Sequence, residues 1–301
     1  MKRRVAIAGS GAWGQALAHV ARTAGHEVSM WSRQKSDVVS FASLDAVIVA
    51  VPAQAVREVL TLIKPPKSIP LIIGAKGIEQ QTAKFMNEVV AEAVPGAHTL
   101  VLSGPSFAGD VVKGLPTAVT LAAPTLAEAG EWAQALSLPT FRVYGSDDVL
   151  GVEIGGALKN VLAIACGISD GKGLGDSARA ALTTRGFAEL MRFGKKLGAK
   201  PETLTGLAGL GDLLLTCSSR QSRNYSFGLA IGQGAPVSAA LAAARGVVEG
   251  AHTARVAQAL AVRHEVDMPI VAAVSAIIDQ GAEPAQEIAR LLARPVREEI
   301  R

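Results

Sequence analysis

The sequence predicts an α/β domain built on a doubly wound sheet, followed by an all-helical domain. Two observations support this prediction. Apolar strand-like runs alternate with helical segments over the first half of the 301 residues, and long helical segments fill the second half. Strands that are apolar throughout are typical of a parallel sheet covered by helices on both faces. We place the domain boundary near Asp147, which gives domains of residues 1–147 and 148–301.

The elements are expected in the following order. Strands are predicted at residues 4–9, 26–33, 44–52, 69–77, 98–106, 117–123 and 140–146, with helices at 14–25 and 53–63. In the second half, helices are predicted at residues 151–167, 177–197, 238–244, 251–264, 268–280 and 285–294. No uninterrupted apolar run of about 18 residues occurs, so we expect no integral membrane segment.

The composition limits the classes of function. The net charge of +4 is modest and scattered, and aromatic residues make up only 4% of the chain. Because single-stranded nucleic acids are bound largely by stacking on aromatic side chains, we expect no nucleic-acid partner. Cys166 and Cys217 lie in apolar surroundings without the spacing of metal ligands. This pattern favours reduced core thiols in a cytoplasmic protein and predicts no metal site.

A glycine-rich turn follows the first strand and opens the first helix. It carries Gly9, Gly11 and Gly14 in the pattern Gly-x-Gly-x-x-Gly. The first glycine permits a tight turn, the second lets a pyrophosphate approach the backbone, and the third allows close packing of helix on sheet. The helix N-terminus adds N–H donors and a positive dipole. In this context the pattern predicts a Rossmann-like dinucleotide-binding domain.

The tip of the second strand indicates which dinucleotide is bound. An acidic residue at this position holds the ribose 2′-hydroxyl of NAD. Here the strand ends in Trp31-Ser32-Arg33, with Lys35 close by and no carboxylate at the tip. Because a guanidinium suits a 2′-phosphate, the sequence favours NADP(H), with NAD(H) as the alternative cofactor. A solvated loop arginine is the competing interpretation.

Lys159 lies in the middle of an apolar helical segment, residues 153–168. An unpaired ammonium is costly to bury, and burial lowers the pKa of a lysine toward neutrality. Such a lysine can give and retake a proton near neutral pH, as a dehydrogenase requires. The alternative is a lysine whose amine reaches solvent along the helix surface. The five histidines stand in no motif, so we expect none of them to take this role.

Two further stretches carry groups that suit an anionic substrate. Lys76 follows the C-terminal end of a strand, where doubly wound sheets bind ligands. Asp212 lies in a glycine-rich turn, and Ser222, Arg223 and Asn224 follow it in one short loop. Guanidinium groups match phosphate oxygens, so this loop is a candidate phosphate clamp. Taken alone, it is equally well a solvated basic turn.

Together, these stretches resemble the bacterial NAD(P)-dependent glycerol-3-phosphate dehydrogenase family over nearly the whole chain. The resemblance rests on the order and spacing of GSGAWGQALA at 9–18, AKGIE at 75–79, SGPSFA at 103–108, EIGGALKN at 153–160, GLGDLLLTC at 209–217, SRN at 222–224 and VVEG at 247–250. It implies a Rossmann-like domain followed by a helical domain. It also implies reversible NAD(P)H-dependent reduction of dihydroxyacetone phosphate to sn-glycerol 3-phosphate, for phospholipid synthesis in the cytoplasm.

The resemblance also assigns roles to residues. Lys159 would accept the proton in glycerol 3-phosphate oxidation and donate it in the reverse reaction, with Lys76 and Asp212 as the other catalytic residues. The matching substrate-binding residues are Lys76, Gly104, Ser106, Lys159, Asp212, Ser222, Arg223 and Asn224. The matching cofactor-binding residues are Gly9, Gly11, Ala12, Trp13, Gly14, Arg33, Lys76, Ala108, Arg223 and Glu249. The oligomeric state stays open, with a homodimer as one option.

One segment departs from the family pattern. Family members carry a longer stretch between the second and third strands, where this chain has only QKSDVVSFAS and LDA, residues 34–46. This length is near the minimum for a parallel crossover. Part of the wall on the adenine side is therefore missing, and we expect any departure from the family to affect cofactor affinity and preference.

Two other functions are alternatives to this one. A reductase of the same architecture that acts on a keto acid or an acyl-CoA would need neither the SRN loop nor Lys76. A catalytically silent NADPH-binding sensor would predict loss of Lys159 or Asp212, and both are present.

Overall fold

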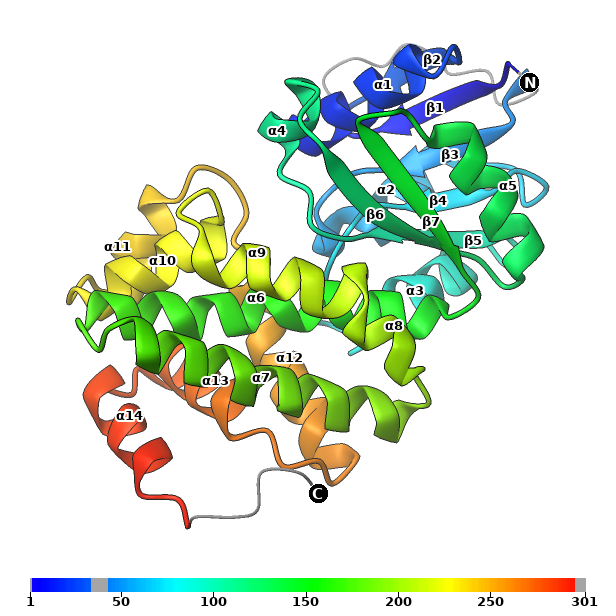
Figure 1. Ribbon diagram of the computed structural model, residues 1–301. Helices are drawn as coiled ribbons and strands as arrows, with labels where there is room; N and C mark the ends of the chain where they lie inside the picture. The colour runs from blue at the N-terminus through cyan, green and yellow to red at the C-terminus, as the bar shows by residue number, and fades with distance from the viewer. Residues whose placement is uncertain (1, 34–42, 296–301) are drawn as a thin grey trace.

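The computed structural model describes residues 2–33 and 43–295, which form a seven-stranded sheet with its helices and an adjoining helical body (Figure 1). The strand order is β2-β1-β3-β4-β5-β6-β7. The strands are β1 (Arg4–Ala8), β2 (Glu27–Trp31), β3 (Ala46–Val49), β4 (Leu71–Ile73), β5 (Thr99–Ser103), β6 (Thr117–Ala122) and β7 (Phe141–Ser146). All seven predicted strands are present, each at or inside its expected bounds.

Helices cover both faces of the sheet because the side chains of each strand alternate between the two faces. One face packs on α1 and α5, and the other packs on α2 and α3. The helices of this domain are α1 (Ala12–Thr23), α2 (Val56–Ile63), α3 (Met86–Ala93), α4 (Ala108–Val112) and α5 (Leu126–Leu136), with a short 3₁₀ turn, η2 (Ala53–Ala55). The sequence did not predict α3, α4 or α5. At the start of α5, Thr125 and Glu128 have the spacing of a helix start, and the Thr125 side chain accepts the Glu128 N–H.

The prediction of a parallel sheet was wrong for its last two strands. β6 pairs antiparallel with β5 and parallel with β7, so β6 and β7 run against the first five strands. The connection from β5 to β6 contains α4, which has five residues and spans about 7.5 Å. A parallel connection must return the chain along the full length of a strand. The short helix does not do so, and the next strand therefore runs in the opposite direction.

The second half of the chain forms the helical body. Its elements are α6 (Val149–Gly171), α7 (Asp176–Leu197), α8 (Pro201–Thr205), a π-helical turn η3 (Leu207–Gly211), α9 (Asp212–Ser218), α10 (Arg223–Gly232), α11 (Val237–Ala243), α12 (Glu249–Arg263), α13 (Pro269–Gln280) and α14 (Pro284–Leu292). Helix α6 lies at the centre, surrounded by the others (Figure 1). It is long and apolar enough to cross a membrane, but 83% of its most apolar window is buried in the protein, as expected of a core helix.

Helices α6 and α10 cross in close contact because glycines line the crossing. A Cβ atom on Gly167 would lie 2.1 Å from a carbonyl oxygen of α10, and one on Gly228 would lie 2.1 Å from a carbonyl oxygen of α6. Gly171 and Gly232 repeat this arrangement one turn further along, with contacts of 2.4 Å. Larger side chains at these positions would force the two helices apart. The N-terminus of α10 would then move away from α6.

We therefore expect Gly228→Ala to lower the free energy of unfolding by at least about 1–3 kcal/mol, the usual cost of overpacking a core. Gly130→Ala is the matched control, because Gly130 is exposed on α5 and a Cβ there would meet no atom within 4 Å. Alanine favours a helix over glycine by about 1 kcal/mol, so the control should be neutral or stabilising. Urea unfolding curves of both variants measure the difference, and equal stabilities would contradict the close crossing.

Candidate active site

Two lysines and an aspartate meet where the sheet domain adjoins the helical body. Asp212, which is 1% exposed, accepts from Lys159 Nζ at 2.5 Å and from Lys76 Nζ at 2.7 Å, one lysine on each carboxylate oxygen. Lys159 also donates to Thr216 Oγ1 at 3.1 Å, and Lys76 donates to the carbonyl oxygen of Gly104 at 3.0 Å. The three residues predicted to be catalytic are thus in direct contact, although they come from separate parts of the sequence.

Burial changes how these groups hold protons. Burial lowers the pKa of Lys159 to about 8, although the Asp212 carboxylate opposes this effect. Burial alone would raise the pKa of Asp212, but the two neighbouring ammonium groups outweigh it and keep that pKa below its usual range. Lys159 can therefore exchange a proton near neutral pH while Asp212 stays ionised. Within the described residues, each lysine uses two of its three N–H donors, so one donor on each is available to another oxygen.

Two glycines of α6 allow the three residues to meet. A Cβ on Gly156 would lie 2.8 Å from a hydroxyl oxygen of β5 and 3.5 Å from Lys76 Cγ. A Cβ on Gly155 would lie 2.4 Å from a carbonyl oxygen of the π-helical turn that precedes Asp212. Because neither position has a side chain, α6 contacts both the end of β5 and the π-helical turn before α9.

The glycine-rich turn predicted around Asp212 is in fact helical. The π-helical turn η3 leads directly into α9, and Asp212 is the first residue of α9. The glycines serve close packing, since a Cβ on Gly209 would lie 1.9 Å from a carbonyl oxygen of α8.

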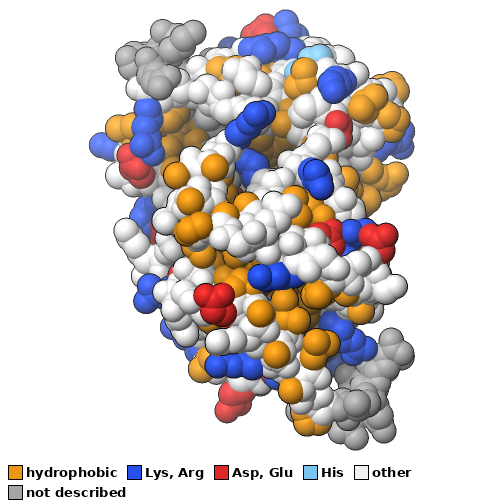
Figure 2. Space-filling model, turned by 90° about the vertical axis from the view of Figure 1, so that its left-hand side faces the viewer, with side chains coloured by type: hydrophobic (Ala, Val, Ile, Leu, Met, Phe, Trp, Pro, Cys, Tyr) orange, Lys and Arg blue, Asp and Glu red, His pale blue; other side chains and the backbone are white. Residues whose placement is uncertain are grey.

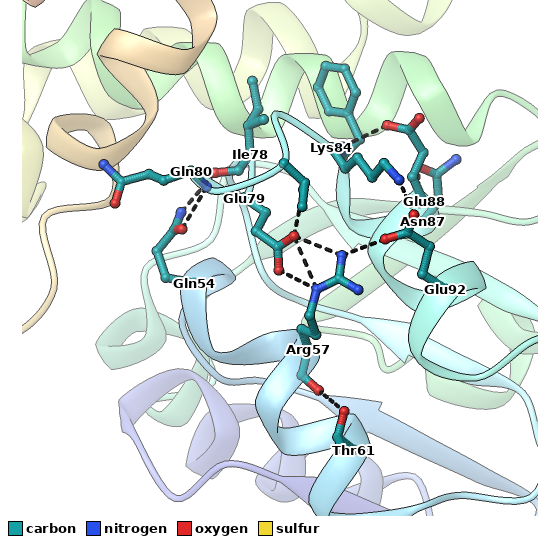
Figure 3. A network of polar contacts seen from close by, with 12 residues as sticks. Gln54, Arg57, Thr61, Ile78, Glu79, Gln80, Lys84, Asn87, Glu88 and Glu92 are labelled. Atoms are coloured by element: carbon teal, nitrogen blue, oxygen red, sulfur yellow. Dashed lines mark hydrogen bonds and ion pairs between the residues drawn. The ribbon is translucent and has the colours of Figure 1, made fainter.

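A charged network fixes the loop that carries Lys76 (Figure 3). Arg57 of α2 donates to the two oxygens of Glu79 at 2.9 and 2.8 Å, and to Glu92 of α3 at 2.7 Å. The hydrogen bond from Arg57 lowers the pKa of the buried Glu79 carboxyl. The side chain of Gln54 bonds the backbone on either side of Glu79. The loop that carries Lys76 is therefore held at residues 78–80 by side chains of η2 and α2.

The predicted phosphate clamp is a helix N-terminus and not a loop. Ser222 caps α10, its Oγ accepting the N–H of the residue three positions later at 3.2 Å. Asn224 donates to Asn160 Oδ1 at 2.9 Å and accepts the N–H of Gly250 at 2.8 Å, so it ties α10 to α6 and α12. Ser222 and Asn224 are buried, whereas Arg223 is exposed at the first position of α10. A guanidinium beside a helix N-terminus attracts anions.

The glycine-rich turn has the shape that a dinucleotide needs. Gly9 has a φ of 127°, and a Cβ there would lie 2.5 Å from a carbonyl oxygen just after β3. A Cβ on Gly14 would lie 2.0 Å from the carbonyl oxygen of Gly9. Gly11, in contrast, faces open space and caps α1 without a side-chain hydrogen bond. The N-terminal turn of α1, with Ala12 and Trp13, contains no acidic residue. These residues fit a pyrophosphate group.

The predicted cofactor residues Arg33 and Glu249 lie on different elements. Arg33 follows β2 and is about half exposed, and its Nη2 atom lies 2.8 Å from Oε2 of Glu58 on α2. Glu249 is the first residue of α12 and accepts the N–H of Ala53, just after β3, at 3.1 Å. Burial raises the pKa of Glu249 to about 7. Glu249 thus connects the helical body to the sheet domain.

The other predicted residues lie after β5, next to Lys76. Gly104 has a φ of 141°, and a Cβ there would lie 2.8 Å from the backbone of β6, so only glycine fits. Ser106 Oγ donates to the Gly104 carbonyl oxygen at 3.0 Å, and Ala108 begins α4. Lys35 and the rest of residues 34–42, which make up most of the shortened segment, lie outside the described residues. Figure 2 shows Lys and Arg side chains on both sides of the junction between the sheet domain and the helical body.

Sequence reasoning missed Thr216 and Asn160. Thr216 Oγ1 accepts from Lys159 and donates to the carbonyl oxygen of Asp212 at 2.6 Å. Asp212 and Thr216 are four residues apart, and this spacing places two side chains on one face of a helix once the helix is recognised. Asn160 follows Lys159 in the sequence and bonds Asn224.

A cavity of about 1120 Å³ lies elsewhere, between α6, α7, α13 and α14. Its lining is mostly apolar and contains none of the predicted site residues. Chemistry, and not volume, therefore identifies the lysine cluster as the candidate active site.

Comparisons with known proteins identify the family of the chain. The family model for the C-terminus of NAD-dependent glycerol-3-phosphate dehydrogenase matches residues 148–289, and the N-terminus model matches residues 4–43 and 36–129. A relative from Parvibaculum lavamentivorans, named glycerol-3-phosphate dehydrogenase (NAD(P)+), is 46% identical over 327 residues, covering 99% of this chain and 98% of the relative. A relative of the same name from Bradyrhizobium sp. strain BTAi1 is 49% identical, covering 98% of each chain.

The alignment with the Parvibaculum relative is longer than the 301 residues of this chain, so the relative carries residues that this chain lacks. The two N-terminal matches overlap at residues 36–43, where the sequence shows a shortened segment. The crystal structure of glycerol-3-phosphate dehydrogenase from Coxiella burnetii superposes with a TM-score of 0.91 at 38% identity, covering 97% of this chain and 99% of that chain. The chain belongs to the NAD-dependent glycerol-3-phosphate dehydrogenase family.

Proposed function

We propose that this chain reduces dihydroxyacetone phosphate reversibly to sn-glycerol 3-phosphate with a nicotinamide dinucleotide. The observation that carries the proposal is the buried cluster of Lys159, Asp212 and Lys76. In this cluster a lysine with a lowered pKa and a second cation lie at the junction of the two halves of the chain, which supports proton transfer by Lys159. The glycine-rich turn, which fits a pyrophosphate, follows β1, and Lys76 follows β4 of the same sheet. The names of the curated relatives support this reaction.

In this proposal, Lys159 moves the proton. When the cofactor is bound, its nicotinamide supplies the hydride for the carbonyl carbon. The unused N–H of Lys159 gives its proton to the carbonyl oxygen, and the resulting neutral amine regains a proton from solvent. Asp212 holds Lys159 in place and keeps the site close to neutral overall. The unused N–H of Lys76 stabilises the same oxygen as negative charge develops on it.

The substrate phosphate lies at the N-terminus of α10 in this proposal. Arg223 contributes the guanidinium, and the first turn of α10 contributes N–H donors. Ser222 and Asn224 keep that helix end in position through their hydrogen bonds. Gly104 and Ser106 form the opposite side of the substrate site, next to Lys76.

We assign the cofactor to the turn at Gly9, Gly11 and Gly14, with Ala12, Trp13, Ala108 and Glu249 nearby. Arg33 favours NADP(H), and NAD(H) is the alternative cofactor. For the cell, we infer a cytoplasmic enzyme that supplies glycerol 3-phosphate for glycerophospholipid synthesis. We keep the domain boundary near Asp147, between β7 and α6.

One assay tests the reaction. NADPH oxidation is followed with dihydroxyacetone phosphate, ketopantoate or acetoacetyl-CoA as the substrate. Rapid turnover of dihydroxyacetone phosphate alone supports the proposal. Preference for either of the other substrates would overturn it, because neither has a phosphate next to its carbonyl group for Arg223 to bind.

We expect Lys159→Met to keep the fold and cofactor binding but to lower kcat by about 10²–10⁴-fold, the usual contribution of general acid–base catalysis. Methionine fills a similar apolar space without a proton. Steady-state kinetics measure the loss, and thermal unfolding together with NADPH titration shows whether the variant is folded. A folded variant with near-normal turnover would exclude Lys159 as the proton donor.

The pH dependence should differ between the two directions of the reaction. Lys159 has a pKa of about 8, so it is protonated below pH 8 and neutral above it. Reduction needs the proton, so kcat/KM for dihydroxyacetone phosphate should fall as the pH rises through about 8. Oxidation needs the neutral amine, so kcat/KM for glycerol 3-phosphate should rise over the same range. Parallel profiles in both directions would contradict this role, since kcat/KM reports the free enzyme.

We expect Arg223→Ala to lower kcat/KM for dihydroxyacetone phosphate by about 1.5–3 kcal/mol, the usual contribution of a charge-assisted hydrogen bond. Arg263→Ala, which removes an exposed arginine from the far end of α12, is the control for the change in net charge. Added phosphite should partly restore turnover of a phosphate-free substrate in the wild type but less in Arg223→Ala. If both variants behave alike, the phosphate binds elsewhere.

A further inference from the structure

An acidic side chain lies beside the arginine that is expected to select the cofactor. Arg33 Nη2 is 2.8 Å from Glu58 Oε2, and the two side chains are 53% and 62% exposed. The pair joins β2 to α2, two elements that are 25 residues apart at these positions. Within the described residues, the second carboxylate oxygen of Glu58 has no hydrogen-bond partner. It is therefore available to a donor on a ligand.

Dinucleotide-binding domains use opposite charges at this place. An acid at the tip of the second strand accepts a hydrogen bond from the ribose 2′-hydroxyl of NAD, whereas an arginine accommodates the 2′-phosphate of NADP. In this chain the strand tip supplies Arg33, and α2 supplies Glu58 next to it. Both kinds of group are thus present at one point.

Helix α2 holds Glu58 at a fixed position. Arg57, the preceding residue, bonds the buried Glu79 carboxylate and Glu92 of α3 (Figure 3). These contacts anchor α2 to the loop after β4 and to α3. The Glu58 carboxylate therefore extends from an anchored helix, in contact with Arg33.

We propose that Glu58 is a specificity-determining residue for the cofactor, and this inference rests on the assignment of Arg33 to the ribose under the proposed function. With NAD(H), the Arg33–Glu58 pair stays intact and Glu58 accepts a hydrogen bond from the 2′-hydroxyl. When NADP(H) binds, the 2′-phosphate must replace Glu58 as the partner of Arg33. The phosphate then lies near the negative charge of Glu58. Glu58 therefore narrows the preference for NADP(H) that Arg33 creates.

The test is Glu58→Gln, which removes the charge and keeps the shape. The dissociation constants of NADPH and NADH are measured by fluorescence titration without substrate. We expect NADPH to bind about two- to fivefold more tightly and NADH about two- to fivefold more weakly, as for an exposed ion pair. The matched control is Glu27→Gln, which removes the equally exposed partner of Lys2 at the amino end of β2. Glu27→Gln should change each dissociation constant by only a small fraction of the change that Glu58→Gln causes.

Glu58→Gln is also made in the Arg33→Ala background, which separates the effect of the Arg33–Glu58 ion pair from a general effect of removing a charge. In Arg33→Ala, the gain in NADPH binding caused by Glu58→Gln should shrink, and the loss in NADH binding should persist. If Glu58→Gln leaves the ratio of the two constants unchanged, or changes it no more than Glu27→Gln does, the proposal is overturned. If Arg33→Ala leaves the ratio unchanged, Arg33 does not contact the ribose and the proposal is overturned with it. Because no substrate is used, failure to reduce dihydroxyacetone phosphate would reject the proposed reaction without affecting this result.

Discussion

The candidate active site depends on one buried carboxylate, that of Asp212, held between two ammonium groups. Asp212 is almost fully buried, and an unpaired charge at such a place is strongly destabilising. Lys159 and Lys76 compensate it from two different elements, α6 and the loop after β4. Burial also lowers the pKa of Lys159 to about 8, and the Asp212 carboxylate limits this shift. The pairing of the charges and the proton transfer proposed for Lys159 therefore both follow from burial.

Close backbone contacts allow Lys159, Lys76 and Asp212 to meet. Glycines on α6 let it approach β5, the turn before α9, and α10 within distances that any Cβ would prevent. Asn224 then connects α10 to α6 and α12, and Glu249 connects α12 to the sheet domain. The exposed Arg223, on α10, and the buried Lys159, on α6, are thus both positioned by α6. Two side chains that lie far apart in the sequence therefore share one support.

The two proposed sites are organised differently. The proposed catalytic groups are buried and fixed by several contacts each, whereas Arg33 and Glu58, which we propose select the cofactor, are exposed and joined by a single ion pair. Exposed pairs contribute little energy, about 0–1 kcal/mol. A modest difference in free energy suits a site that accepts either of two cofactors, while the buried cluster suits a site with one reaction.

The sequence by itself determined the alternation of strands and helices, the glycine-rich turn and the presence of Lys159 in an apolar helix, because periodicity and local turn chemistry are written in neighbouring residues. It also carried the motifs that identify the family. Only the tertiary structure decided the direction of β6 and β7, the helical setting of Asp212 and the structural roles of Ser222 and Asn224. The contact of Arg33 with Glu58 and that of Lys159 with Thr216 likewise emerged only from folding. Each of these depends on contacts between distant segments, and no local pattern specifies which segments will meet.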